Sequence, residues 1–102
     1  KADDFWAAGG FDEDLAVAYN DVDLCIRVHD QLHRDNVWAH EVELYHYESV
    51  TRGYDVKSRE KMERLKRESA RFYKRYPAII DNDPYYNPNL SRTSGNCIVR
   101  EV

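Results

Sequence analysis

The fold of this chain is constrained most by a helical pattern that directly follows a cluster of acidic residues. In the stretch GGFDEDLAVAYNDVDLCIRV, residues 9–28, apolar residues begin to recur at every fourth position, and the pattern continues to Leu32. These apolar residues are Leu24, Val28 and Leu32. The spacing places them on one face of an α-helix, so it predicts an amphipathic helix of about three turns. Asn20 is a good N-cap residue for this helix, and its end is expected between Leu32 and Arg34.

Two acidic residues, Asp21 and Asp23, fall in the first turn of this predicted helix. They have two interpretations. Acidic residues near a helix N-terminus stabilise the helix by ~0.3–1 kcal/mol, which requires no function. A first-turn carboxylate in a polar cleft is also well placed to take a proton from a substrate hydroxyl. The residues alone leave both interpretations open.

A second helix is predicted between Ser58 and Pro77. Apolar and small residues recur there at spacings of three and four, namely Met62, Leu65, Ser69, Phe72 and Tyr76. Its other face is basic and is expected to be solvated. Between the two helices, NVWAH and VELYH read as short extended pieces. In the second piece Val42, Leu44 and His46 share one face, which predicts a strand with His46 facing inward at its end.

Composition and charge exclude several classes of protein. The 102 residues suffice for one domain, and 42% hydrophobic with 33% charged residues is a globular balance. The net charge of −4 argues against a nucleic-acid-binding platform. No apolar run approaches the ~20 residues of a membrane span, and the first residues lack the pattern of a signal peptide. Two cysteines without CxxC spacing fit a reducing compartment, with Cys25 as a small buried residue.

Five motifs follow one another along the chain. They are Gly-Gly-Phe-Asp-Glu at residues 9–13, Asn-Asp-x-Asp-Leu-Cys-x-Arg at 20–27, Leu-Tyr-His-x-Glu-Ser at 44–49, Arg-Gly at 52–53 and Asp-Pro-x-Tyr-Asn-Pro-Asn-Leu-Ser at 83–91. Together and in this order they resemble the C-terminal half of bacterial family 2 glycosyltransferases. The members of that family are inverting nucleotide-sugar enzymes with the GT-A fold, and they build polysaccharides such as O-antigens and capsules.

The resemblance implies an α+β fold, as a C-terminal fragment of the GT-A α/β fold with two main helices and a short mixed or antiparallel sheet. Residues 1–91 would form the C-terminal half of the glycosyltransferase domain, which carries the acceptor site and the catalytic base. Residues 92–102 would be an irregular tail or a short strand. The nucleotide-binding half would precede residue 5, so the fragment alone is expected to be inactive.

The resemblance also assigns roles to the acidic residues. Asp21 matches the family's catalytic base, which deprotonates the acceptor hydroxyl while that oxygen attacks the anomeric carbon. Asp23 matches a second family acid, which orients the acceptor or the helix terminus. Asp12 and Glu13 lie in the loop that borders the acceptor pocket, and Asn20 is assigned to acceptor binding with them.

A metal site is implied by the same resemblance. His46 matches the histidine that helps bind a divalent metal together with an Asp-x-Asp motif from the N-terminal half. The metal, Mn²⁺ or Mg²⁺, would neutralise the departing diphosphate, and a mixed oxygen and imidazole shell slightly favours Mn²⁺. Arg52 and Gly53 fall in a loop that would close over the diphosphate. Tyr47 stands where many members carry a second histidine.

The implied partners are a nucleotide-diphosphate sugar donor and a saccharide or lipid-linked saccharide acceptor, without nucleic acid. The expected location is the cytoplasm, including the inner face of the plasma membrane. The residues leave an alternative, a non-catalytic interaction module that docks through the basic helix 57–75. A metal-dependent hydrolase would need ligands beyond His46 that the sequence does not supply in recognisable form.

Self-association is the first testable expectation. If a missing half leaves apolar surface exposed, copies of the fragment should bury that surface against one another. Light scattering across a concentration series is expected to give a dimer or a higher oligomer at high concentration. A monomer whose mass does not change with concentration would contradict the expectation.

Overall fold

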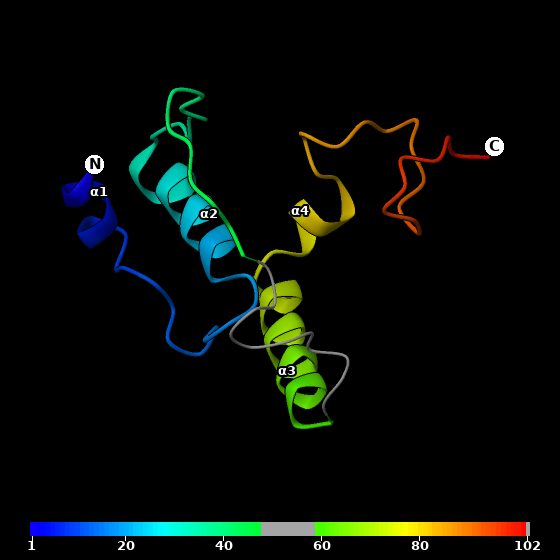
Figure 1. The fold of residues 1–102 in the computed structure, drawn as a ribbon, viewed down its shortest axis with the longest axis horizontal. Helices are drawn as coiled ribbons and strands as arrows, with labels where there is room; N and C mark the ends of the chain where they lie inside the picture. Colours follow the sequence, from blue (N-terminus) through cyan, green and yellow to red (C-terminus); the bar gives the residue numbers. More distant parts are fainter. Residues whose placement is uncertain (48–58, 102) are drawn as a thin grey trace. The chain divides into compact units, whose positions relative to one another are not determined.

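A computed structural model describes residues 1–47 and 59–101 of the chain (Figure 1). Contacts divide the chain into two units, Lys1–Phe72 and Tyr73–Val102, and each is described by itself. The helices in the described residues are α1 (Ala2–Ala7), α2 (Asn20–Leu32), α3 (Arg59–Arg75) and α4 (Pro77–Asp81). The predicted end of the glycosyltransferase-like region at residue 91 stays a prediction, because a division by contacts does not define a functional region.

The α+β fold class predicted from the sequence is wrong. Over residues 1–47 and 59–101 the regular structure is helical, and antiparallel pairing is limited to an isolated bridge between Leu90 and Val99. Neither the mixed or antiparallel sheet nor the GT-A α/β fragment is present in these residues. The extended pieces in residues 36–47 form no strand, and Leu44 is 88% exposed. A strand takes its backbone hydrogen bonds from a neighbouring strand, so an alternating pattern cannot form one alone.

Helix α2 confirms the helical pattern that begins at Asn20. The predicted cap is wrong by one position, because Tyr19 is the N-cap residue and its side chain makes no capping hydrogen bond. The C-terminal limit is confirmed. His33 caps α2 in the left-handed region, at φ 52°, and its backbone N–H donates to the carbonyl oxygen of His29 at 3.1 Å. This arrangement satisfies a carbonyl that the helix end would otherwise leave without a partner.

Helix α3 confirms the second predicted helix, although the predicted cap, Ser58, lies outside the described residues. Pro77 does end this helix, and it also begins α4, where its missing N–H costs no helical hydrogen bond. Phe72 is 3% exposed, as its place in the apolar pattern predicts, and its ring stacks on Tyr19 at a centroid distance of 4.7 Å. The stacking ties α3 to the residue that precedes α2.

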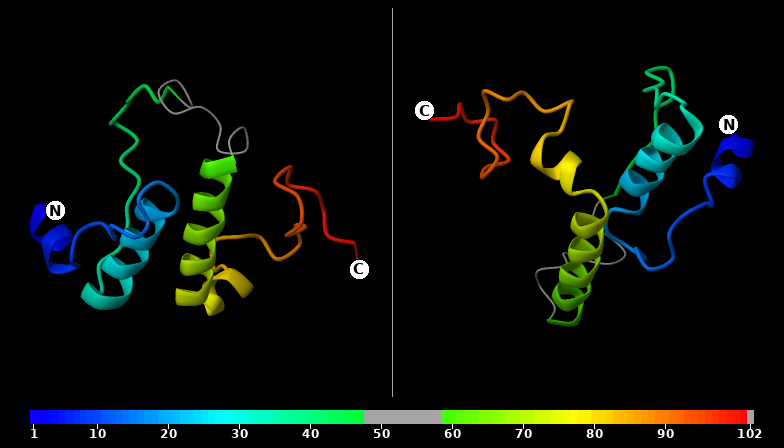
Figure 2. Two further views of the ribbon diagram at one scale, coloured as in Figure 1. Left: turned by 90° about the horizontal axis from the view of Figure 1, so that it is seen from below. Right: turned by 180° about the vertical axis from the view of Figure 1, so that it is seen from behind.

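The first unit contains α1, α2 and most of α3. Helix α1 packs beside α2, and residues 8–19 return from the end of α1 to the start of α2 (Figure 2). The buried apolar side chains among the described residues are few, namely Ala8, Leu15 and Phe72. Cys25 is exposed, so the prediction that it is a small buried residue is wrong. With so small a core, polar contacts must carry much of the internal order.

In the second unit, α4 leads into an irregular segment. Around the bridge of Leu90 with Val99, the Ser91 N–H donates to the Ile98 carbonyl and the Arg100 N–H to the Asn89 carbonyl, each at 2.7 Å. Across the part of the chain that the structure describes, none of the helices has both the length and the apolar content that crossing a bilayer requires.

The contact of Phe72 with Tyr19 gives a stability prediction. Phe72→Ala removes a buried ring and should lower the free energy of unfolding by about 3 kcal/mol. Urea titration followed by helical circular dichroism measures this change. Trp38→Ala is the matched control, because Trp38 is 85% exposed and its removal should change the free energy by less than about 0.5 kcal/mol. Equal effects of the two changes would contradict the packing described.

Candidate functional site

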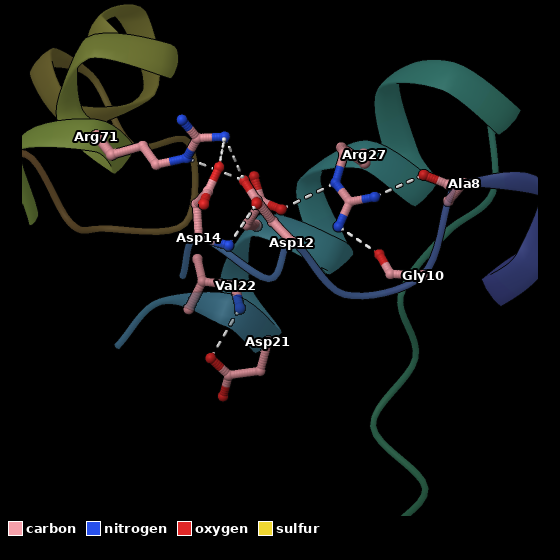
Figure 3. Close-up of polar contacts among 9 residues, drawn as sticks. Ala8, Gly10, Asp12, Asp14, Asp21, Val22, Arg27 and Arg71 are labelled. Carbon is pink, nitrogen blue, oxygen red and sulfur yellow. Dashed lines mark hydrogen bonds and ion pairs between the residues drawn. The ribbon is translucent and has the colours of Figure 1, made fainter. Parts of the chain in front are cut away.

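The start of α2 is held by a buried ion pair. Asp23 is fully buried, and its Oδ2 accepts a hydrogen bond from Arg27 Nε one turn later at 2.9 Å. The Nη atoms of the same guanidinium donate to the carbonyl oxygens of Ala8 at 2.5 Å and Gly10 at 2.6 Å (Figure 3). One guanidinium therefore joins α2 to the backbone after α1, and its charge compensates that of Asp23.

The two glycines of this passage have backbone conformations that other residues rarely adopt. Gly9 has φ 92° and Gly10 has φ 69°. A Cβ atom at either position would meet its nearest neighbour at an ordinary contact distance, 3.6 Å at Gly9 and 3.4 Å at Gly10. Positive φ, rather than lack of space, is therefore the reason for glycine here. This backbone turns the Ala8 and Gly10 carbonyl oxygens toward Arg27.

Asp21 lies in a different environment from Asp23. It is exposed in the first turn of α2, where its Oδ1 accepts the neighbouring Val22 N–H at 2.8 Å. Figure 3 shows its side chain turned away from Arg71, Asp12 and Asp14. Of the two acids in this turn, Asp21 is therefore the one that a molecule in solution can reach.

Asp23 is buried and bonded to Arg27. Its assigned role, to orient the acceptor or the helix terminus, stays a prediction. Asn20 is half-buried as the first residue of α2. Its assignment to acceptor binding stays a prediction.

Asp12 is bound to α3. Its Oδ2 accepts from Arg71 Nε at 3.2 Å and Nη2 at 3.1 Å, and its Oδ1 accepts the backbone N–H of Asp14 at 3.0 Å. The Asp14 carboxylate lies 3.2 Å from the same guanidinium (Figure 3). Glu13, between them, is exposed. The loop expected to border an acceptor pocket is thus tied to α3 through Asp12, and it presents the acids Glu13 and Asp14 to solvent.

Two residues of α3 that the sequence did not point to as site residues bind the loop before α2. Glu68 is 4% exposed and accepts the backbone N–H groups of Val17 and Ala18, and Arg71 holds Asp12 and Asp14. Glu68 lies three residues after Leu65 and four before Phe72, so it shares their helical face, and this spacing is the sequence signal of its burial. The partners of Glu68 and Arg71 lie 50 or more residues away in sequence, so no local pattern could identify these partners.

The predicted metal ligand is placed differently from the expectation. His46 is exposed in an irregular segment, so the prediction of an inward-facing histidine at a strand end is wrong. Within residues 1–47 and 59–101, no three His, Cys, Asp or Glu side chains gather closely enough to hold a metal ion. His46 offers one imidazole, and the described residues do not complete a site around it. Arg52 and Gly53 lie outside the described residues.

Comparison with known proteins finds a relative of this chain. The chain is 41% identical over 92 residues to an uncharacterized protein, y4gI, of Sinorhizobium fredii (strain NBRC 101917 / NGR234). The match covers 89% of this chain and 10% of y4gI, so the chain spans about a tenth of the length of that curated relative. No protein-family model and no solved structure matches the chain. The matching stretch is therefore a small part of the longer y4gI polypeptide.

The ion pair beneath α2 gives a second stability prediction. Arg27→Met leaves the Asp23 carboxylate buried without the guanidinium and should lower the free energy of unfolding by about 3 kcal/mol. The double change Asp23→Leu with Arg27→Met should recover most of this loss, because neither charge then remains buried. Urea titrations of the single and double variants measure both effects.

Arg34→Met is the matched control for Arg27→Met. Arg34 is exposed, and its Nε lies 3.7 Å from Asp4, so losing this ion pair should cost less than about 1 kcal/mol. If Arg27→Met lowers the free energy of unfolding no more than Arg34→Met does, the Asp23–Arg27 pair does not stabilise the fold as described.

Proposed function

We propose that this chain is the acceptor-side region of a nucleotide-sugar-dependent inverting glycosyltransferase that acts in cell-surface polysaccharide biosynthesis, with Asp21 as general base. The observation that carries the proposal is the contrast within the first turn of α2. Asp23 is buried and bonded to Arg27, whereas Asp21, two residues earlier, is exposed. A carboxylate on a rigid helix turn, open to solvent and next to a fixed loop, suits proton abstraction from a hydroxyl.

The proposed reaction is a single displacement. The acceptor oxygen forms a bond to the anomeric carbon as the bond from that carbon to the diphosphate oxygen breaks, and the bonding pair leaves with the nucleoside diphosphate. The hydroxyl proton passes to the Asp21 carboxylate. Such a step inverts the anomeric configuration and needs one base near the acceptor, without a protein nucleophile. The chain offers Asp21 for this role.

The supporting residues keep the base in place. Arg27 fixes the first turn of α2 to the backbone after α1, and Arg71 fixes the preceding loop to α3 through Asp12. General bases are effective only when their geometry is maintained close to the productive one. Because the first turn and the loop before it are each tied to another part of the unit, Asp21 has a defined position.

The donor and the metal remain predictions. A nucleotide-diphosphate sugar would be bound mainly by residues outside this chain, and the Mn²⁺ or Mg²⁺ expected at His46 would need ligands from there as well. The proposed proton transfer uses Asp21 alone and does not run through the metal. The relation to y4gI supports the proposal only in that the matching stretch there belongs to a longer polypeptide.

The test uses the complete polypeptide that carries this chain. The substrates are a panel of UDP-, GDP- and dTDP-hexoses with methyl hexoside acceptors, and the released nucleoside diphosphate is measured. Asp21→Asn should lower kcat by about 10²–10⁴-fold, because the amide cannot take the proton. Binding of the nucleotide sugar, measured by calorimetry, should stay largely intact because Asp21 acts on the acceptor.

Asp30→Asn is the matched control, since Asp30 is an exposed acid near the other end of the same helix. This change should leave kcat within about twofold of the unmodified protein. Full transfer activity in Asp21→Asn would exclude Asp21 as the base. No nucleoside diphosphate release by the unmodified protein from any donor of the panel would count against the transferase proposal.

A further inference from the structure

A buried carboxylate on α3 holds the backbone that leads into α2. Glu68 Oε1 accepts the N–H of Val17 at 3.2 Å, and Oε2 accepts the N–H of Ala18 at 2.7 Å. Hydrogen bonds from backbone N–H groups to an ionised carboxylate are stronger than neutral ones, and burial strengthens them further. Both carboxylate oxygens are therefore engaged with the chain itself, just before α2.

The next residue, Tyr19, has an unfavourable backbone conformation. Its φ is 63° and its ψ is 5°, in the left-handed region that a tyrosine seldom adopts. Such a conformation persists only where the surrounding structure imposes it. Here Glu68 holds the two residues before Tyr19, and the Tyr19 ring stacks on Phe72, four residues after Glu68 on α3. Helix α3 thus contacts this turn through both its backbone, at Val17 and Ala18, and the Tyr19 side chain.

The conformation at Tyr19 sets the start of α2. Tyr19 is the N-cap residue, and its carbonyl oxygen accepts the N–H of Asp23 at 2.9 Å, which is the first hydrogen bond of the helix. Asp21 lies between these two residues. A change of φ or ψ at Tyr19 would rotate the first turn and move the Asp21 carboxylate with it.

We propose that Glu68 is a positioning residue that holds the Tyr19 turn, and through it the Asp21 carboxylate, in the orientation that the acceptor hydroxyl requires. This inference rests on the proposed function, which it deepens by assigning to α3 the control of the general base. Glu68 acts through the backbone of residues 17–19 and does not contact the acceptor.

The first experiment measures the backbone directly. Glu68→Gln keeps the size of the side chain but replaces one carboxylate oxygen with an NH₂ group that cannot accept a hydrogen bond. In the complete polypeptide, hydrogen–deuterium exchange at the Val17 and Ala18 amides should rise about tenfold, as expected for losing a hydrogen bond to a charged group. Glu60 is an exposed acid in the first turn of the same helix, so Glu60→Gln should leave exchange at the Val17 and Ala18 amides unchanged. Unchanged exchange in Glu68→Gln overturns the proposal.

The second experiment asks whether Glu68 acts through Asp21. Glu68→Gln should lower kcat about tenfold with the donor that turns over in the panel, and leave KM for that donor within about twofold. In an Asp21→Asn background, the same change should lower kcat by less than about twofold further, because the base it positions is already gone. A purely structural role would lower kcat equally in both backgrounds, and that result would overturn the proposal.

The two experiments separate the failure of this proposal from failure of the proposed function. Full activity of Asp21→Asn would exclude the base, and with it the positioning of a base by Glu68. Exchange at Val17 and Ala18 would then still decide whether Glu68 holds the backbone before α2. Reduced activity of Asp21→Asn with unchanged exchange in Glu68→Gln would retain the base and exclude Glu68 as its positioning residue.

Discussion

The buried pair of Asp23 with Arg27 is the interaction on which the first unit depends. A fully buried carboxylate is stable only when its charge is compensated, and Arg27 does this while donating to the carbonyl oxygens of Ala8 and Gly10. The same guanidinium thus satisfies an acid inside α2 and fixes the backbone that follows α1. Arg27 therefore links the start of α2 to the glycine passage.

A second set of polar contacts ties the loop before α2 to α3. Glu68 binds the backbone of Val17 and Ala18, and Arg71 binds Asp12 and Asp14. Few apolar side chains are buried among the described residues, so these charged contacts supply order that a larger core would otherwise provide. The consequence for function is that Asp21 stands on a helix turn fixed from two sides.

The sequence predicted the two long helices, α2 and α3, correctly, whereas the sheet that it predicted is not present in the described residues. Residues 20–32 and 59–75 carry apolar residues at helical spacing. A helix makes its backbone hydrogen bonds within its own segment, so this spacing alone was enough to locate α2 and α3. The alternation of Val42, Leu44 and His46 needed a neighbouring strand, which the described residues do not provide. Asn20 was expected as the cap by residue preference, but the strained backbone at Tyr19 moved the cap by one residue.

By itself the sequence determined the two long helices and the placement of Asp21 and Asp23 in one helical turn, because these depend on neighbours in the chain. Only the tertiary structure decided which of the two acids is buried and which is exposed. It also decided that Glu68 and Arg71 hold a loop 50 or more residues away in sequence. The burial of one acid rather than its neighbour, and the pairing of charged residues, depend on what the fold brings alongside them, and helical periodicity does not specify those partners.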